Sequence, residues 1–293
     1  MVPEPNEQPS TPGAALRAAK RSGLLLRILV GVPMLAVVLG LIVYSPPMLQ
    51  LLILLAMASY GTWEYVGLIT PVDGTPVARA SLMLVAMLPV VGGAWWGLAG
   101  LSAAMSLALT LVLLRTLFRG EGLGNGSLAH GGLALVGLAV VGWPIAHVGL
   151  LLSLPGGGWW IVHLVLTMAA SDTAAYAVGS SMGRHRLLPA VSPRKSVEGL
   201  VAALAAGAAV GLLGPLWLQA GDPFGGRGGL ALLGVALAFA GQLGDLLESK
   251  IKRDTGAGDS GRLLPGHGGF LDRWDSFILT PPLLFYTLWV VSA

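Results

Sequence analysis

The 293-residue sequence contains no cysteine and few charged residues. The absence of cysteine excludes disulfides, thiolate metal sites and cysteine nucleophiles. Charged residues make up 11% of the chain, whereas soluble domains carry roughly 25%. Hydrophobic residues make up 55%. This composition excludes a soluble globular protein and is typical of a helical membrane protein.

Long apolar runs predict an all-α fold, a polytopic transmembrane helical bundle. A bilayer core of about 30 Å requires about 20 apolar residues per helix. The runs are continuous, whereas the strands of a transmembrane barrel alternate between apolar and polar residues. We expect about nine spans, at residues 24–44, 48–69, 79–96, 98–118, 131–153, 159–180, 198–219, 228–248 and 270–291.

The distribution of Lys and Arg predicts the orientation of the chain. These residues gather in alternate loops, which places those loops and the amino terminus in the cytoplasm and the carboxyl terminus outside. The domains that we expect are a disordered cytoplasmic tail at 1–22, an N-terminal transmembrane bundle of about five spans at 23–158, and a C-terminal catalytic transmembrane region at 159–293 with cytoplasmic loops at 181–197 and 249–269.

The chain carries a net charge of +3, but we expect no nucleic-acid partner. No basic face interleaved with stacking aromatic residues is visible in the sequence. The excess of Lys and Arg is instead attributed to cytoplasmic loops beside the bilayer.

Acidic residues in the C-terminal half predict a metal site. Residues 245–275 hold 11 of the 31 charged residues, and a smaller cluster lies at 172–198. Asp172 and Asp245 fall inside apolar runs, where an ionised side chain requires a partner or a cavity. With Asp272, they place acids from three helices near one face of the bundle. Because hard oxygen ligands without histidine or thiolate favour Mg²⁺ over zinc, we expect a magnesium site.

Other interpretations of these polar residues remain open. Asp272 could simply complement the dipole of the helix that follows it. Residues 265–269, Pro-Gly-His-Gly-Gly, could hold a phosphate on backbone N–H groups, or could be an ordinary turn. His147 and His163 are expected to be packing or helix-bonding residues. Glu64, buried in a span, is expected to form a structural ion pair.

Two segments resemble a known family. Residues 249–275 (SKIKRDTGAGDSGRLLPGHGGFLDRWD) closely resemble the signature of phosphatidate cytidylyltransferases, also called CDP-diacylglycerol synthases. Residues 171–176 (SDTAAY) and 192–199 (SPRKSVEG) resemble an upstream motif of the same family. Together the segments cover about the last 120 residues, and the first five spans match mainly in hydropathy and in Trp63-Glu64.

The resemblance implies a membrane nucleotidyltransferase of phospholipid biosynthesis. Such an enzyme condenses CTP with phosphatidic acid to give CDP-diacylglycerol and pyrophosphate. It implies Mg²⁺, a monovalent cation such as K⁺ and often a homodimer. By motif position, Asp245 and Asp272 would be the metal ligands. The catalytic residues that it implies are Asp172, Lys195, Asp259, His267, Arg273 and Asp275. Apart from the resemblance, the glycine-rich turn and the basic residues near it predict phosphate binding by Lys252, Arg253, Arg262, Gly268 and Gly269.

The sequence departs from the family pattern at three positions. Gly258 replaces a lysine, Trp274 replaces an aliphatic residue, and Ala174 stands where glycine is common. Two other functions compete with the expected one, namely a cation-coupled transporter that uses Asp172, Asp245 and Glu64, and a CTP-dependent enzyme acting on an isoprenoid lipid. We expect an integral protein of a bacterial plasma membrane whose active site faces the cytoplasm.

Overall fold

The structure is a computed structural model that describes residues 37, 39–41, 43–69, 76–118, 127–218, 223–257 and 269–292. It divides into two units, Met1–Ser45 and Pro46–Ala293. In the first unit, the described residues from 37 to 44 are helical. The predicted tail at 1–22 and most of the predicted span at 24–44 lie outside the described residues.

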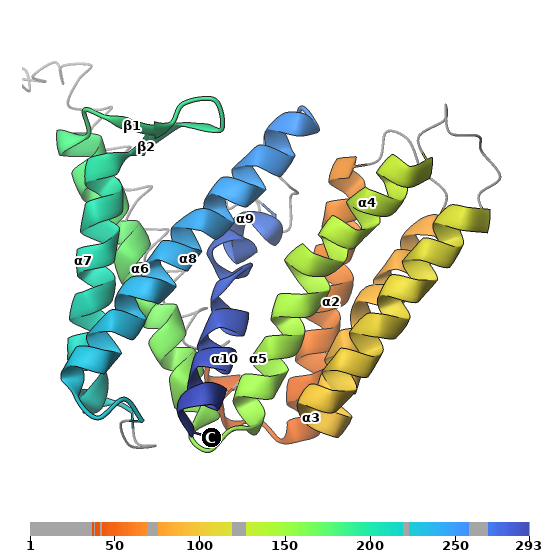
Figure 1. The fold of residues 1–293 in the computed structure, drawn as a ribbon, viewed down its shortest axis with the longest axis horizontal. Coiled ribbons are helices and arrows are strands. Elements are labelled where there is room, and N and C mark those ends of the chain that lie inside the picture. Colours follow the sequence, from red (N-terminus) through yellow and green to blue (C-terminus); the bar gives the residue numbers. More distant parts are fainter. Residues whose placement is uncertain are drawn as a thin grey trace, which may run out of the picture. The chain divides into compact units, whose positions relative to one another are not determined.

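The second unit is built almost entirely of helices (Figure 1). Its elements, in chain order, are α2 (Pro47–Ile69), α3 (Pro76–Phe118), α4 (Ser127–Gly137), the π-helix η2 (Leu138–Gly142), α5 (Trp143–Ser153), α6 (Gly157–Met182), β1 (Arg186–Leu188), β2 (Ser192–Ser196), α7 (Val197–Leu213), the 3₁₀-helix η3 (Gly214–Leu216), α8 (Arg227–Asp254), α9 (Leu271–Trp274), the 3₁₀-helix η4 (Asp275–Phe277) and α10 (Thr280–Ser292). The all-α prediction is confirmed.

Seven helical stretches of the described residues are long and apolar enough to cross a membrane, a criterion of length and composition. One of them, α3, is broken at Trp96 and Gly97. Gly97 has a φ of +59°, a conformation that favours glycine. The two arms of α3 therefore correspond to the separate spans expected at 79–96 and 98–118.

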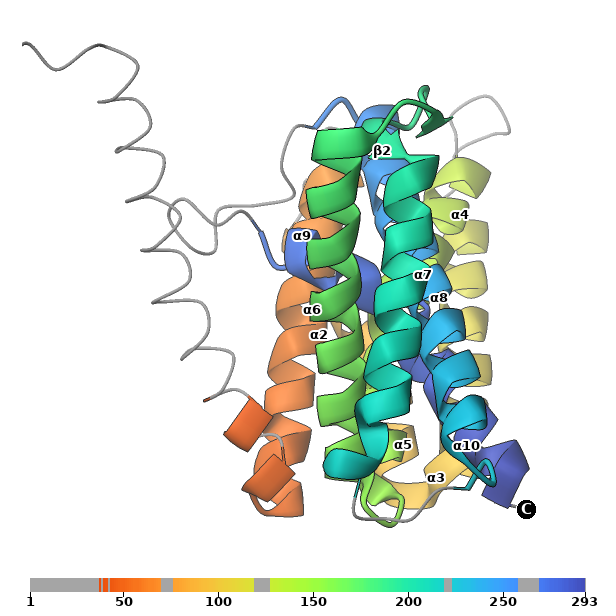
Figure 2. The ribbon, with the colours of Figure 1, turned by 90° about the vertical axis from the view of Figure 1, so that its left-hand side faces the viewer.

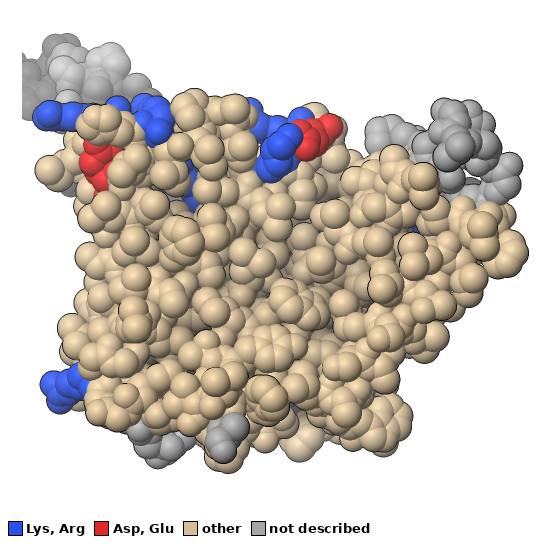
Figure 3. All heavy atoms as spheres, in the orientation of Figure 1, with Lys and Arg blue, Asp and Glu red and all other residues tan. Residues whose placement is uncertain are grey.

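Charged side chains gather at one end of the helices (Figure 3). Lys, Arg, Asp and Glu lie along the edge that carries β1, β2 and the end of α8, and a broad band below them shows none of these residues on this face. A band without charge between two polar ends is what a bilayer-spanning bundle requires.

Three segments of the structure begin, end or fold differently from what the sequence led us to expect. The expected loop at 181–197 contains the antiparallel hairpin β1–β2, in which Arg186 pairs with Ser196. Helix α8 continues to Asp254, so Lys250, Lys252 and Arg253 lie on a helix and not in a loop. Ion pairs between residues four apart, Glu248–Lys252 and Lys250–Asp254, support this last polar part of α8.

The last predicted span, 270–291, is also interrupted. Helix α9 passes into η4, and α10 begins only at Thr280. Pro281 and Pro282 have no N–H to donate to the carbonyls four residues before them, so a continuous helix cannot form here. The interruption places the acidic residues 272 and 275 on short, separate turns.

Helices α6, α7 and α8 pack side by side (Figure 2). Glycines allow the closest approach: a Cβ atom at Gly207 would lie 2.4 Å from the carbonyl oxygen of Gly234 on α8. Small residues permit such contacts between helix backbones in lipid.

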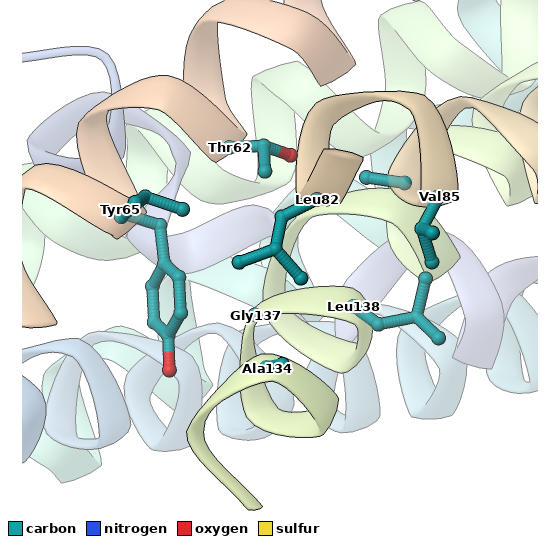
Figure 4. Close-up of a pocket in the computed structure, with 9 residues that line it drawn as sticks. Thr62, Tyr65, Leu82, Val85, Ala134, Gly137 and Leu138 are labelled. Carbon is teal, nitrogen blue, oxygen red and sulfur yellow. The ribbon is translucent and has the colours of Figure 1, made fainter. Parts of the chain in front are cut away.

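A small cavity lies in the part of the bundle formed by α2, α3, α4 and η2. It has a volume of about 10 Å³ and lies between Thr62 and Tyr65 of α2, Leu82 of α3, and Leu138 (Figure 4). This volume corresponds to about one water molecule. The Tyr65 hydroxyl donates a hydrogen bond of 2.8 Å to the carbonyl oxygen of Leu133 and joins α2 to α4. This cavity is too small for a substrate.

Candidate active site

A cavity of about 710 Å³ lies beside the ends of α6 and α8, where β2, α7, α9 and η4 meet them. Six of the residues that the sequence singled out line it. They come from five different elements: Asp172, Lys195, Asp245, Asp272, Arg273 and Asp275. Because α6 ends at Met182, Asp172 lies ten residues before that end, about 15 Å along the helix axis.

Asp172 is held by two uncharged side chains. The Gln242 amide donates to Asp172 Oδ1 at 3.0 Å, and the Ser276 hydroxyl donates to Asp172 Oδ2 at 3.2 Å. Gln242 and Ser276 are buried. These bonds fix an acid of α6 against α8 and η4, which are 70 and 104 residues further along the chain.

Lys195 of β2 supplies positive charge to the same group. Its Nζ lies 2.8 Å from Asp245 Oδ2 and donates to Gln242 Oε1 at 3.1 Å. Gln242 therefore bridges Lys195 and Asp172, with its amide orientation determined by the charge on each side. Gln242 lies three residues before Asp245 in the sequence, and no sequence motif signals this bridging contact.

A second ion-pair group lies at the end of α8. Lys252 Nζ lies 2.8 Å from Glu248 Oε1 and 2.9 Å from Asp272 Oδ1. The side chain of Glu248 is only 4% exposed, so its charge depends on Lys252. Asp272 Oδ2 accepts a hydrogen bond of 2.7 Å from the Gly269 N–H. Lys252 and Gly269, predicted to contact phosphates, thus both contact a predicted metal ligand.

Asp275 lies close to Asp245 because the helix beside it lacks a side chain. A Cβ atom on Gly244 of α8 would lie 2.3 Å from the carbonyl oxygen of Asp275. The Asp275 carboxylate accepts a hydrogen bond of 2.7 Å from the Ser276 N–H and lines the same cavity as Asp172 and Asp245. The cavity therefore concentrates negative charge that cations can neutralise.

Arginines of the β1–β2 hairpin also line the cavity, and the sequence did not single them out as site residues. Arg186 and Arg194 are exposed, and Arg186 Nη1 donates to the Arg194 carbonyl oxygen at 3.3 Å. The two strands of the hairpin that turns them toward the cavity have only three and five residues, too short to be recognised from hydrophobic periodicity. The sequence feature that could have pointed to these two arginines is the basic composition of residues 184–195.

The remaining predicted site residues fall in two groups. Arg253 does not belong to the lining, and its Nε donates to the Val191 carbonyl oxygen, which joins α8 to the hairpin. Its phosphate-binding role stays a prediction. Those that lie outside the described residues are Asp259, Arg262, His267 and Gly268, together with the departure at Gly258.

The donor atoms of the cavity suit a hard cation. Four carboxylates line it, and none of its described lining residues is a histidine. Within the described part of the chain, however, no three His, Asp or Glu side chains are placed so that they could hold a metal by themselves. Mg²⁺ is usually bound by one or two carboxylates together with waters and substrate phosphates, so the residues fit this ion in the presence of a nucleotide.

The structure also shows contacts of three buried residues that were expected to have structural and not catalytic roles. His147 Nδ1 lies 2.8 Å from the Trp143 carbonyl oxygen, and His163 packs against the rings of Trp160 and Trp217, as expected. Glu64 Oε2 accepts a hydrogen bond of 3.0 Å from the Leu271 N–H, and the ion pair expected for Glu64 stays a prediction.

Comparison with known proteins finds relatives that are named phosphatidate cytidylyltransferase. The chain is 41% identical over 131 residues to a phosphatidate cytidylyltransferase of Mycobacterium bovis, covering 44% of this chain and 42% of the relative. It is 43% identical over 133 residues to one of Staphylococcus saprophyticus (43% and 47%) and 47% identical over 117 residues to one of Synechocystis (40% and 39%). The chain thus matches less than half the length of these relatives.

The match to a family model is more extensive. The model of the cytidylyltransferase family covers residues 25–291. It therefore includes α2 to α5 as well as the elements that form the cavity. With a charged cavity inside a helical bundle and a match over nearly its whole length, this chain belongs to the cytidylyltransferase family.

Proposed function

We propose that the protein is a membrane nucleotidyltransferase that condenses CTP with phosphatidic acid to form CDP-diacylglycerol and pyrophosphate. The observation that carries the proposal is the cavity, where carboxylates of four helices meet Lys195 and arginines of the hairpin and of α9 at the charged end of an otherwise apolar bundle. Its relatives named phosphatidate cytidylyltransferase support the choice of substrates.

The chemistry requires little from a general base. The second pKa of a phosphate monoester is about 6, so phosphatidate is largely dianionic at neutral pH and brings its own nucleophile. One of its phosphate oxygens forms a bond to the α-phosphorus of CTP, and the bond from that phosphorus to the bridging oxygen breaks. Pyrophosphate leaves with the electron pair. Positioning and charge neutralisation then supply most of the catalysis.

Cationic side chains of the cavity are suited to this neutralisation. Lys195 lies between Asp245 and Gln242, and Arg273 lines the cavity beside Asp272. Arg186 and Arg194 stand at the hairpin, at the outer side of the same cavity. We propose that these groups hold the phosphates of the two substrates, with Gln242 and Ser276 keeping Asp172 in place.

We further propose that Asp245 and Asp272 hold Mg²⁺. When bound, the ion would neutralise charge on the phosphates of CTP and on the departing pyrophosphate. Lys195 and Lys252 contact these two carboxylates in the structure, so they also stabilise this arrangement of acids. The monovalent cation and the homodimer implied by the resemblance stay predictions.

We place the protein in a bacterial plasma membrane with the cavity facing the cytoplasm. The supporting observation is the excess of Lys and Arg at the end of the helices that carries the cavity. This orientation brings soluble CTP to a lipid whose tails remain in the bilayer.

The test is an assay of purified protein with radiolabelled CTP, Mg²⁺ and phosphatidic acid, with the lipid product identified by chromatography. We expect labelled CDP-diacylglycerol, its loss on addition of EDTA, and its loss in Asp272→Asn. The matched control is Asp254→Asn, which alters an exposed acid on the last turn of α8 that pairs with Lys250 outside the cavity.

Three outcomes would contradict the proposal. A polyprenyl phosphate that reacts in place of phosphatidic acid would favour the isoprenoid alternative. Cation uptake into proteoliposomes without nucleotide turnover would favour a transporter. Normal turnover by Asp272→Asn would remove Asp272 as a metal ligand.

A further inference from the structure

The active-site cavity leaves α2 without an assigned role. None of the described lining residues comes from α2, although this helix contains the buried residue Glu64. Glu64 is 2% exposed, and its Oε2 accepts the Leu271 N–H at 3.0 Å across 207 residues of sequence. Leu271 is the first residue of α9, and Asp272 and Arg273 follow it directly into the cavity.

Aromatic packing reinforces the contact between α2 and α9. Gly61 leaves room for the ring of Phe270, because a Cβ atom there would lie 2.7 Å from Phe270 Cε1. Tyr60 meets the same ring edge-on, at 6.3 Å between centroids. The Phe270 ring stacks on Trp274, which stacks on Phe277 of η4. One turn of α2 thus supports the segment from Phe270 to Phe277.

This segment requires such support because of its length. Helix α9 has four residues and η4 has three, and isolated helices of this size are not stable in water. The hydrogen bonds of α9 begin at the Phe270 carbonyl, which accepts from the N–H groups of Arg273 and Trp274. The contact at Leu271 therefore lies at the point where the geometry of the whole segment is set.

We propose that Glu64 is a positioning residue that holds α9 in register, so that Asp272 and Arg273 point into the cavity. It acts as a hydrogen-bond acceptor for the Leu271 N–H and does not contact substrate. What Asp272 and Arg273 do there rests on the proposed function, whereas the positioning itself does not.

Hydrogen–deuterium exchange of the detergent-solubilised protein tests the positioning without any assay of activity. In Glu64→Ala, we expect amide exchange in peptides covering 269–278 to rise at least about tenfold, since the segment loses its buried acceptor. Glu64→Gln retains a side-chain oxygen and should exchange as the unmodified protein does.

Tyr65→Phe is the matched control. It removes one buried hydrogen bond from the next residue of α2, but that bond leads to Leu133 of α4. We expect it to lower the thermal midpoint by a similar amount and to raise exchange near residues 133–137, with no change at 269–278.

The kinetic readout separates positioning from general destabilisation. Glu64→Ala should lower kcat by about 10- to 100-fold, as expected when reacting groups are displaced. Glu64→Gln and Tyr65→Phe should remain within about threefold of the unmodified protein, a difference too small for a lost contact in the transition state.

The proposal would be overturned by either of two results. Exchange at 269–278 that is unchanged in Glu64→Ala would show that α9 does not depend on Glu64. A loss of kcat in Glu64→Gln as large as in Glu64→Ala, with normal exchange, would show that the charge of Glu64 takes part in the reaction. If no variant, nor the unmodified protein, uses CTP, the proposed function fails while the exchange result still stands.

Discussion

Three of the acids that line the cavity each form an ion pair or a hydrogen bond with a neighbouring side chain. Asp245 contacts Lys195, Asp272 contacts Lys252, and Asp172 is bonded to Gln242 and Ser276. Buried or half-buried carboxylates are costly unless they are paired and hydrogen-bonded. The pairing therefore explains how several acids can share one cavity before a substrate or a cation enters it.

Gln242 is predicted to be essential although it carries no charge. Gln242→Glu would replace the amide donor to Asp172 Oδ1 by a third acid beside Asp172 and Asp245, and Gln242→Ala would only remove the donor. A hydrogen bond to a charged group contributes about 1.5–3 kcal/mol, so we expect about 10- to 100-fold lower kcat/KM in Gln242→Ala and a larger loss in Gln242→Glu. Steady-state kinetics on the two variants checks this order. Equal activity in Gln242→Glu and the unmodified protein would contradict the bridging role.

Lys252 is predicted to stabilise the fold through Glu248. Lys252→Met would leave the buried Glu248 carboxylate without this cation, and we expect a loss of about 3 kcal/mol, at the lower end for breaking a buried ion pair. The double variant Glu248→Leu/Lys252→Met removes both charges and should recover most of the thermal midpoint. It should not recover activity, because Asp272 still lacks Lys252. Thermal unfolding followed by tryptophan fluorescence measures the effect, and a double variant no more stable than the single one would refute the explanation.

At the scale of elements, the site depends on how closely η4 approaches α8. The backbone of Asp275 rests against Gly244, and the hydrogen bonds of Ser276 join the same turn to Asp172 of α6. The hairpin is held to α8 by Arg253 and to α7 by Ser196, whose hydroxyl accepts the Gly199 N–H at 3.2 Å. Short elements are thus fixed by contacts with long helices in addition to their own hydrogen bonds.

Gly244→Ala is expected to reduce activity more than stability. The new methyl group would lie 2.3 Å from the Asp275 carbonyl oxygen, so η4 must move away and take Asp275 with it. A displacement of this size costs about 100-fold in kcat when it reaches reacting groups. The control is Gly228→Ala on the same helix, where the added Cβ meets nothing within 4 Å and alanine improves helix propensity. Kinetics of both variants tests the prediction, and it fails if Gly244→Ala has normal kcat.

For the whole molecule, the orientation in the membrane decides which solution reaches the cavity. The hairpin and the turn before α6 lie at opposite ends of that 26-residue helix, which spans about 39 Å. Under the proposed function, the end that carries the hairpin faces the compartment that supplies CTP, and the other end faces away from it.

The absence of cysteine makes the orientation directly measurable. Ala190→Cys in the hairpin and Pro155→Cys in the turn before α6 each introduce one exposed thiol into a chain that has none. We expect a membrane-impermeant maleimide to label Pro155→Cys in intact spheroplasts, and Ala190→Cys only in inverted vesicles. Labelling of Ala190→Cys from outside would reverse the proposed orientation. Retained CDP-diacylglycerol synthesis in both variants shows that the thiols leave the fold intact.

Much of the fold could be predicted from hydrophobicity because each span must be apolar over its own length. This local property also located the break of α3, between the spans expected at 79–96 and 98–118, and the position of Asp245 inside an apolar run. It did not predict the interruption before Pro281 or the extension of α8 to Asp254, since polar turns at a helix end are stabilised by particular ion pairs. The hairpin β1–β2 was missed because its strands are too short for a periodic signal.

By itself, the sequence determined the membrane-spanning class, the family and the acids of its two motifs, since each of these is written in composition or in consecutive residues. Only the tertiary structure decided which side chains meet. Gln242 bridges Lys195 and Asp172, Glu248 depends on Lys252, and Glu64 accepts the Leu271 N–H from across 207 residues. Such contacts depend on how helices pack, and packing is set by backbone approaches such as that at Gly244, which no single segment contains.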